Sequence, residues 1–199
     1  LYARLLRKLV PSRLPPPEPS HLQPGLLDYP EQAIAACLRE LRRVAQLCRH
    51  SLRLAGETLL FAHSAKDVQT IRLNEQAVNE IKLAMKDYLA GLARRHLSKR
   101  QAILVQHVDR CMSDLERVGD HVETLCNVSL RRRRVPAAIV DRLSFSIFFQ
   151  LYEASLHVLK LIVQSFDPDR DDIPVVADQI LFARDDYVQA SQAVRIHFN

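Results

Sequence analysis

Two acidic residues, Glu116 and Asp120, lie four positions apart in the segment DLERVGDH at positions 114–121. The segment falls within a long stretch of helical periodicity, so both carboxylates project from the same face of the predicted helix. Acids at this spacing repel each other and destabilise a helix unless a cation lies between them. The pair is therefore a candidate metal site.

More oxygen ligands lie on the same side of this predicted helix. At about 100° per residue, Asp109 and Glu123 share a narrow stripe with the pair, roughly 140° from the centre of an apolar face that includes Leu104. The stripe carries four acids and no base, and oxygen ligands suit Mg²⁺, Mn²⁺ or iron, with Zn²⁺ left open. Because one helix cannot complete a coordination shell, Glu75 and Glu80 of the preceding predicted helix are further candidates. The alternative is an ordinary solvated polar face.

Five long helices are expected to position these residues. Hydrophobic periodicity predicts them at about 28–62, 67–96, 98–130, 136–165 and from 174 to the end. Ser98 and Gln101 form a capping box at the start of the third helix. Short connections predict an all-α, antiparallel up-and-down bundle. The fifth helix is still running at Asn199, so we expect a sixth.

The first 27 residues have a different character. Residues 1–10 are predicted to form a short amphipathic helix whose basic face carries Arg4, Arg7 and Lys8. Residues 11–27 contain six prolines and are predicted to be an extended linker.

The composition narrows the function classes. The net charge of +5 fits a membrane surface, a nucleic acid or no particular partner. The four cysteines show no CxxC spacing and are expected to be reduced. No run of 18 apolar residues is present, so we expect no membrane-spanning segment. The sequence has no nucleophile elbow, glycine-rich phosphate loop or aromatic nucleic-acid platform. We therefore expect neither an enzyme nor a nucleic-acid partner.

The acidic segment also resembles a known family motif. LERVGDH at positions 115–121 is similar to the E-x-x-x-D metal-binding motif of the PhoU family of helical phosphate-regulatory proteins, with Glu116 and Asp120 at the motif's acids. Positions 78–89, VNEIKLAMKDYL, resemble the preceding family helix, with Asn79 where the family often has an acid. The resemblance implies two three-helix repeats, at 28–134 and an incomplete 136–199.

A narrower resemblance concerns LLDYPEQA at positions 26–33, followed by REL at 39–41. These segments are similar to the start of the PhoU-like domain fused behind bacterial sodium/phosphate cotransporters. The resemblance implies that residues 1–10 end a membrane helix and residues 11–27 form a linker. Residues 28–199 would then form a PhoU-like domain on the cytoplasmic face of the inner membrane.

On this resemblance, the chain regulates sodium-dependent phosphate transport. Its partners are a transmembrane transporter domain, in cis or in trans, and the inner-membrane surface. Self-association into a homo-oligomer is left open. The alternatives are a free-standing PhoU-like phosphate-uptake regulator and a metal-free helical interaction domain.

Overall fold

The computed structural model describes residues 20–60, 65–132 and 142–198. All regular structure in these ranges is helical, which confirms the all-α prediction. The predicted helix at 1–10, with Arg4, Arg7 and Lys8, lies outside the described residues, as do the linker up to 19 and the predicted helix start at Pro136. The elements are η1 (Pro24–Leu26), α2 (Pro30–Leu60), α3 (Ala65–Ala93), α4 (Lys99–Arg132), α5 (Arg142–Ser165) and α6 (Ile173–Phe198).

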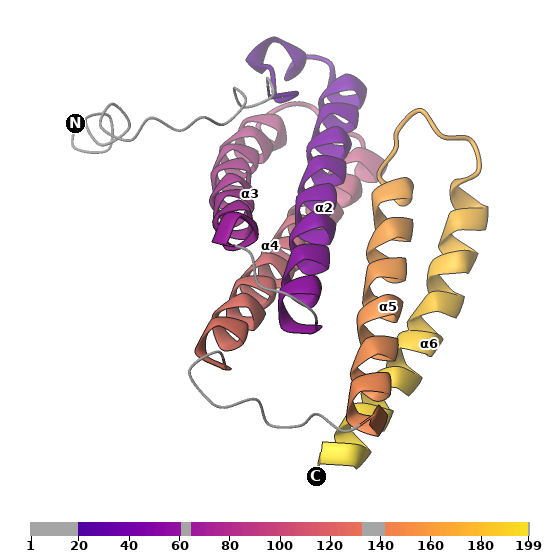
Figure 1. Cartoon of the computed structure of the whole chain (residues 1–199). Helices are drawn as coiled ribbons and strands as arrows, with labels where there is room; N and C mark the ends of the chain where they lie inside the picture. The colour runs from indigo at the N-terminus through magenta and orange to yellow at the C-terminus, as the bar shows by residue number, and fades with distance from the viewer. Residues whose placement is uncertain (1–19, 61–64, 133–141, 199) are drawn as a thin grey trace, which may run out of the picture.

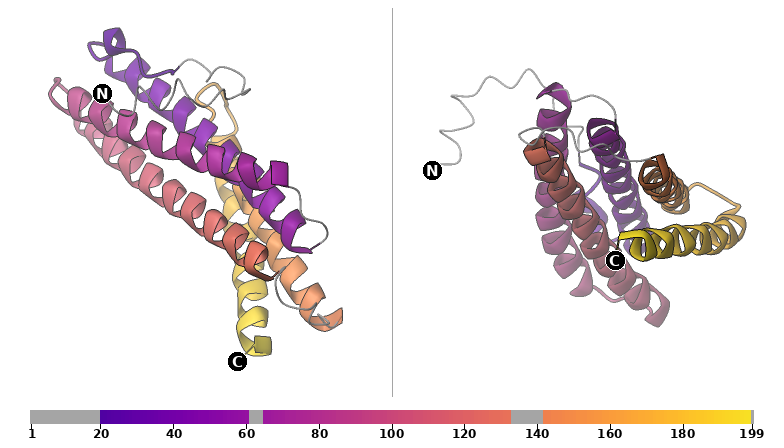
Figure 2. Two further views of the ribbon diagram at one scale, coloured as in Figure 1. Left: turned by 60° about the vertical axis from the view of Figure 1, so that its left-hand side comes forward. Right: turned by 60° about the horizontal axis from the view of Figure 1, so that its bottom comes forward.

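Helices α2, α3 and α4 form a three-helix bundle in which each helix packs against the other two (Figures 1 and 2). The core between them is aliphatic and includes Leu41 and Val44 of α2, Met85 and Leu92 of α3, and Met112 of α4. Helix α5 packs along the other side of α2, and α6 packs mainly against α5 (Figure 1). The chain alternates direction from helix to helix, as expected for an up-and-down bundle.

The buried face of α4 is not quite where the sequence places it. Residues spaced three and four apart are buried, whereas Leu104 is 40% exposed. Helix α4 packs against α2 and α3 together, so its buried face points between those two helices. This direction brings the acidic stripe closer to the core than predicted, because Glu116 and Glu123 are only partly exposed. The buried residues of this face are Val105, Val108, Met112, Leu115, Gly119, Val122, Cys126 and Ser129.

The end of the predicted linker is packed against the bundle. Within residues 20–27, Leu22, Leu26 and Leu27 contact the main core, and η1 replaces the extended conformation that the prolines suggested. The Tyr88 hydroxyl donates a hydrogen bond to the Gln23 carbonyl at 3.1 Å. These leucines favour docking because burying apolar surface offsets the loss of chain freedom.

A buried carboxylate fixes the start of this segment. Glu40 of α2 is 1% exposed. Its Oε1 accepts hydrogen bonds from the His21 backbone N–H at 2.7 Å and from His21 Nδ1 at 3.0 Å. Its Oε2 lies 3.6 Å from Arg43 Nη1. A buried acid of this kind needs such partners, because an unpaired buried charge is strongly destabilising.

A glycine positions α5 against α2. A Cβ atom at Gly56 would overlap Cε2 of Tyr152, so only glycine lets the ring approach this closely. The Tyr152 hydroxyl also donates to the Arg53 carbonyl at 3.2 Å. Among the described helices, α5 alone is long and apolar enough to cross a membrane, and only 17% of its most apolar stretch is buried. One such helix is weak support for a membrane span, and α5 packs along α2 and α6.

Candidate functional site

Acidic side chains from α3 and α4 face one another across the interface between these helices. The pKa of Glu75 on α3 is raised, first by burial and then by repulsion from Glu123, with smaller contributions from Asp120 and Glu116. Carboxylates influence each other in this way only at short range in a partly desolvated setting. Four acids thus share one face of the bundle, which we call the acidic face (Glu75, Glu116, Asp120 and Glu123).

A lysine from α3 neutralises part of this face. Lys82 Nζ lies 2.7 Å from Oε1 of Glu116, whose side chain is 21% exposed. The stripe on α4 carries no base of its own, so the neighbouring helix supplies the cation that the i, i+4 acids require. An incoming metal ion would therefore compete with Lys82 for Glu116.

The other predicted ligands are less well placed. Asp109 is exposed on α4, almost two turns before Glu116. Glu80 is exposed on α3, and its Oε1 accepts a hydrogen bond from Gln76 Nε2 on its own helix at 3.4 Å. Glu75 is thus the acid that α3 brings to the acidic face. Glu75 and Lys82 are seven residues apart, which is about two helical turns, so both lie on the face of α3 that meets α4.

Asn79 modifies the α3 side of the site. Its side-chain amide donates a hydrogen bond to Glu75, one turn earlier on the same helix. This bond lowers the pKa of Glu75 and partly offsets the burial and repulsion that raise it. The amide oxygen of Asn79 is also a suitable hard-cation ligand.

The donor chemistry of the acidic face fits a divalent cation. Carboxylate oxygens are the ligands that Mg²⁺ and Mn²⁺ prefer. The raised pKa of Glu75 indicates that several negatively charged carboxylates lie near one another here. Within the described ranges, however, no three His, Cys, Asp or Glu side chains are grouped closely enough to hold a metal ion. Binding would require Lys82 to move away from Glu116 and the carboxylates to turn inward.

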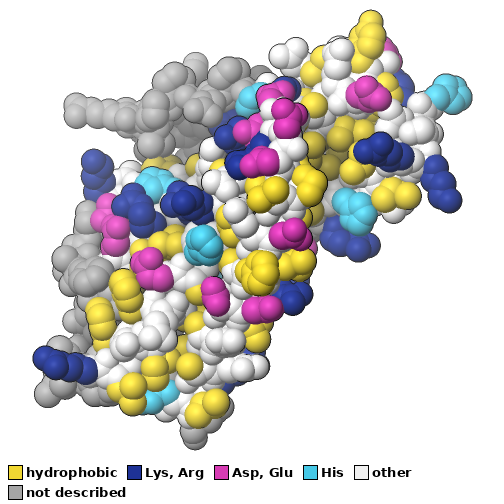
Figure 3. Space-filling view, turned by 90° about the vertical axis from the view of Figure 1, so that its right-hand side faces the viewer, with side chains coloured by type: hydrophobic (Ala, Val, Ile, Leu, Met, Phe, Trp, Pro, Cys, Tyr) yellow, Lys and Arg dark blue, Asp and Glu magenta, His cyan; other side chains and the backbone are white. Residues whose placement is uncertain are grey.

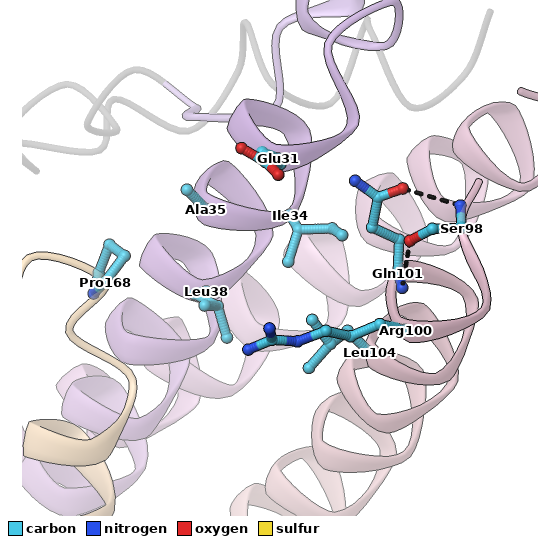
Figure 4. Close-up of a pocket in the computed structure, with 9 residues that line it drawn as sticks. All are labelled: Glu31, Ile34, Ala35, Leu38, Ser98, Arg100, Gln101, Leu104 and Pro168. Carbon is cyan, nitrogen blue, oxygen red and sulfur yellow. Dashed lines mark hydrogen bonds between the residues drawn. The ribbon is translucent and has the colours of Figure 1, made fainter. Parts of the chain in front are cut away.

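A separate pocket of about 400 Å³ lies at the other end of α4, between α2, α4 and the α5–α6 connection (Figure 4). Its wall is largely apolar and includes Ile34 and Leu38 of α2 and Pro168 of the α5–α6 connection. Arg100 extends across it, and Glu31 lies at its rim (Figure 4). None of the acidic-face residues line this pocket.

Comparisons with protein-family models, with curated proteins and with solved structures each give no match to this chain.

Proposed function

We propose that this chain is a PhoU-like regulatory domain that acts on a sodium-dependent phosphate transporter at the cytoplasmic face of the inner membrane. The observation that carries the proposal is the acidic face. Glu116 and Asp120 have the E-x-x-x-D spacing on the third helix of a three-helix bundle, and Glu75 faces them from the second helix.

The α5–α6 hairpin supports a second helical unit beside the first bundle. Helix α6 exposes apolar side chains on several sides, with Leu181 at 52%, Phe182 at 76% and Val188 at 42% exposure. Hydrophobic side chains are spread among the charged ones over this side of the molecule (Figure 3). Exposed apolar side chains gathered on one helix commonly mark a surface that another element or a partner covers. We infer that α5 and α6 are two helices of a second three-helix unit.

The Lys82–Glu116 ion pair suggests how a cation would act on the bundle. The pair links α3 to α4. Glu116 and Asp120 would hold a divalent cation, whose charge would compete with Lys82 for Glu116 and weaken this link. Metal binding would thereby change how α3 and α4 are joined, and the transporter would respond to this local change.

Metal titration of the purified chain tests the acidic face. We expect Glu116→Gln/Asp120→Asn to abolish saturable Mn²⁺ or Mg²⁺ binding. Lys82→Gln should tighten binding up to about fivefold, because it removes a competing, partly exposed ion pair worth about 1 kcal/mol or less. Asp185→Asn, which removes an exposed acid paired with Arg184 on α6, is the matched control and should bind as the wild type does.

Sodium-dependent uptake of radiolabelled phosphate tests the transport role. Cells that carry the transporter with the wild-type chain should differ in uptake from cells with the Glu116→Gln/Asp120→Asn chain. Uptake that is unchanged by this variant and by removal of the chain would contradict the proposal. The coding sequence upstream of Leu1 separates a fused domain from a free-standing regulator, since fusion requires membrane helices there.

A metal-free helical interaction domain is the second candidate. The Lys82–Glu116 pair favours it, because the lysine already offsets part of the charge of the acidic face. Equal metal content in the wild type and in the Glu116→Gln/Asp120→Asn variant would support this alternative.

A further inference from the structure

The connection between α3 and α4 and the adjoining start of α4 carry a dense group of basic side chains. Five basic residues occur within positions 94–100, which contain no acid, and all five are exposed. We call this surface the basic end. It consists of Arg94, Arg95, His96, Lys99 and Arg100.

Within the described ranges, most of these basic side chains have no acidic partner. Arg95 Nε pairs with Asp28 at 3.0 Å. In the described part of the chain, no ion pair involves Arg94, Lys99 or Arg100. Glu31 lines the same pocket as Arg100 without pairing with it. The basic end therefore presents positive charge that no acid in residues 20–60, 65–132 or 142–198 neutralises.

The stability of α4 does not explain these cations. Lys99 and Arg100 lie in the first turn of α4, which contains no acid. The helix dipole places partial positive charge there and disfavours lysine and arginine. The reciprocal hydrogen bonds of Ser98 and Gln101, at 3.3 and 2.9 Å, cap the helix without help from either cation. Residues that break a local rule in this way often serve binding.

Apolar and amphipathic groups accompany the charge. Tyr29 is 61% exposed next to Asp28, the acid that Arg95 holds. Arg100 reaches over the pocket of about 400 Å³, whose apolar wall includes Ile34 and Leu38 (Figure 4). Tyrosine rings and basic side chains together are typical of surfaces that meet lipid headgroups.

We propose that the basic end binds the surface of an anionic phospholipid membrane. The start of α2 lies at the same end of the bundle as the α3–α4 connection (Figure 1), so the helices would stand with these ends toward the lipid. A nucleic acid fits less well, because single-strand binding uses several stacked aromatic rings and duplex reading inserts an element into a groove. The proposal shares with the proposed function only the choice of a membrane as partner.

Vesicle co-sedimentation of the full 199-residue chain tests this surface. The probes are phosphatidylcholine vesicles with and without phosphatidylglycerol, and the variant is Lys99→Gln/Arg100→Gln. The assay is run in an Arg4→Gln/Arg7→Gln/Lys8→Gln background, so that the N-terminal cations do not contribute. Each basic residue near an anionic leaflet raises the membrane affinity about fivefold. We therefore expect the loss of both cations in Lys99→Gln/Arg100→Gln to lower the affinity for the anionic vesicles about 30-fold.

Three comparisons make the outcome decisive. Arg110→Gln/Arg117→Gln removes the same charge from exposed positions farther along α4 and should bind more tightly than Lys99→Gln/Arg100→Gln. The latter variant should melt no lower than its background, because it removes cations from a helix start. Equal affinity of the two variants for anionic vesicles would overturn the proposal. So would equal affinity of the background chain for neutral and anionic vesicles, or a higher affinity for duplex DNA or RNA than for anionic vesicles at the same salt.

Failure of this surface is distinguishable from failure of the acidic face. Glu116 lies about 24 Å along α4 from Arg100, at 1.5 Å per residue. Metal titration of Lys99→Gln/Arg100→Gln should therefore match that of its background, whatever the vesicles show.

Discussion

At the residue scale, the carboxylates of the acidic face repel one another, and one lysine from α3 offsets part of their charge. Lys82 compensates Glu116 directly, whereas Glu75 is left with burial and like charges that raise its pKa. A raised pKa in the folded state means that the ionised form of Glu75 destabilises the fold. The Glu75 carboxylate, a candidate metal ligand, thus lowers the stability of the metal-free protein.

We expect the stability cost of Glu75 to depend on pH. Because its folded-state pKa lies above the ordinary value of 4.5, the native chain takes up this proton more readily than the unfolded chain. The contribution of Glu75 therefore becomes more favourable as pH falls through its folded pKa, and it stops changing below 4.5. Glu75→Gln should raise the unfolding free energy at pH 7 by about 0.5 kcal/mol, as measured by denaturant melts across pH.

Glu80→Gln is the matched control, because Glu80 is exposed on the same helix. It should raise the unfolding free energy at pH 7 by less than Glu75→Gln does. A wild-type carbon NMR titration in which Glu75 protonates at or below 4.5 would refute the expectation.

The cysteines give a second prediction at this scale. Burial raises the pKa of Cys37 and of Cys48 to about 12, so at pH 8 on the order of one thiol in ten thousand is ionised. Cys111 is only partly buried. With a thiol reagent, mass spectrometry should show Cys111 modified first, and Cys37 and Cys48 only as fast as the chain unfolds. Modification of Cys37 in the native protein at the rate of Cys111 would contradict this.

At the element scale, the attachment of α5 depends on Gly56. A glycine inside a helix lowers helix stability by about 1 kcal/mol relative to alanine. Gly56 is favourable only because Tyr152 of another helix packs against it. Sequence patterns could predict both helices but not this contact, because nothing in either segment identifies its partner. The choice of packing face is a tertiary property.

Gly56→Ala should destabilise the protein. The new methyl group would overlap the Tyr152 ring, and overpacking of this kind typically costs about 1–3 kcal/mol, which exceeds the gain in helix propensity. Gly119→Ala is the control, since its Cβ would lie 3.9 Å from Val78 Cγ1, an ordinary contact. It should be stabilising by up to about 1 kcal/mol. Denaturant melts that rank the two variants in the opposite order would refute the packing argument.

At the scale of the whole molecule, stability is unevenly distributed. Helix α2 contacts three other helices, whereas α6 packs mainly against α5. Regions with few buried contacts open most easily. The exposed apolar side chains of α6 therefore belong to the least protected part of the described fold.

Native-state hydrogen exchange should show this gradient. We expect the backbone amides of α6 to exchange well before those of α2, because α6 can open without disturbing the core around Leu41 and Met85. Equal protection of the two helices would mean that α6 is covered, for instance by a second copy of the chain. Repeating the measurement at several protein concentrations distinguishes that case.

The sequence by itself determined the helices, because periodicity, capping residues and prolines act locally. The five predicted helices match α2 to α6 to within a few residues wherever both ends are described. It also determined that Glu116 and Asp120 share a face, since helix geometry requires it.

Only the tertiary structure decided how α4 is rotated about its axis. That rotation leaves Leu104 exposed and places Glu116 at the border of the core. The same holds for the pairing of Lys82 with Glu116, the approach of Glu75 and the docking of residues 20–27. These contacts join residues distant in sequence, and their free energy exists only once the helices have packed.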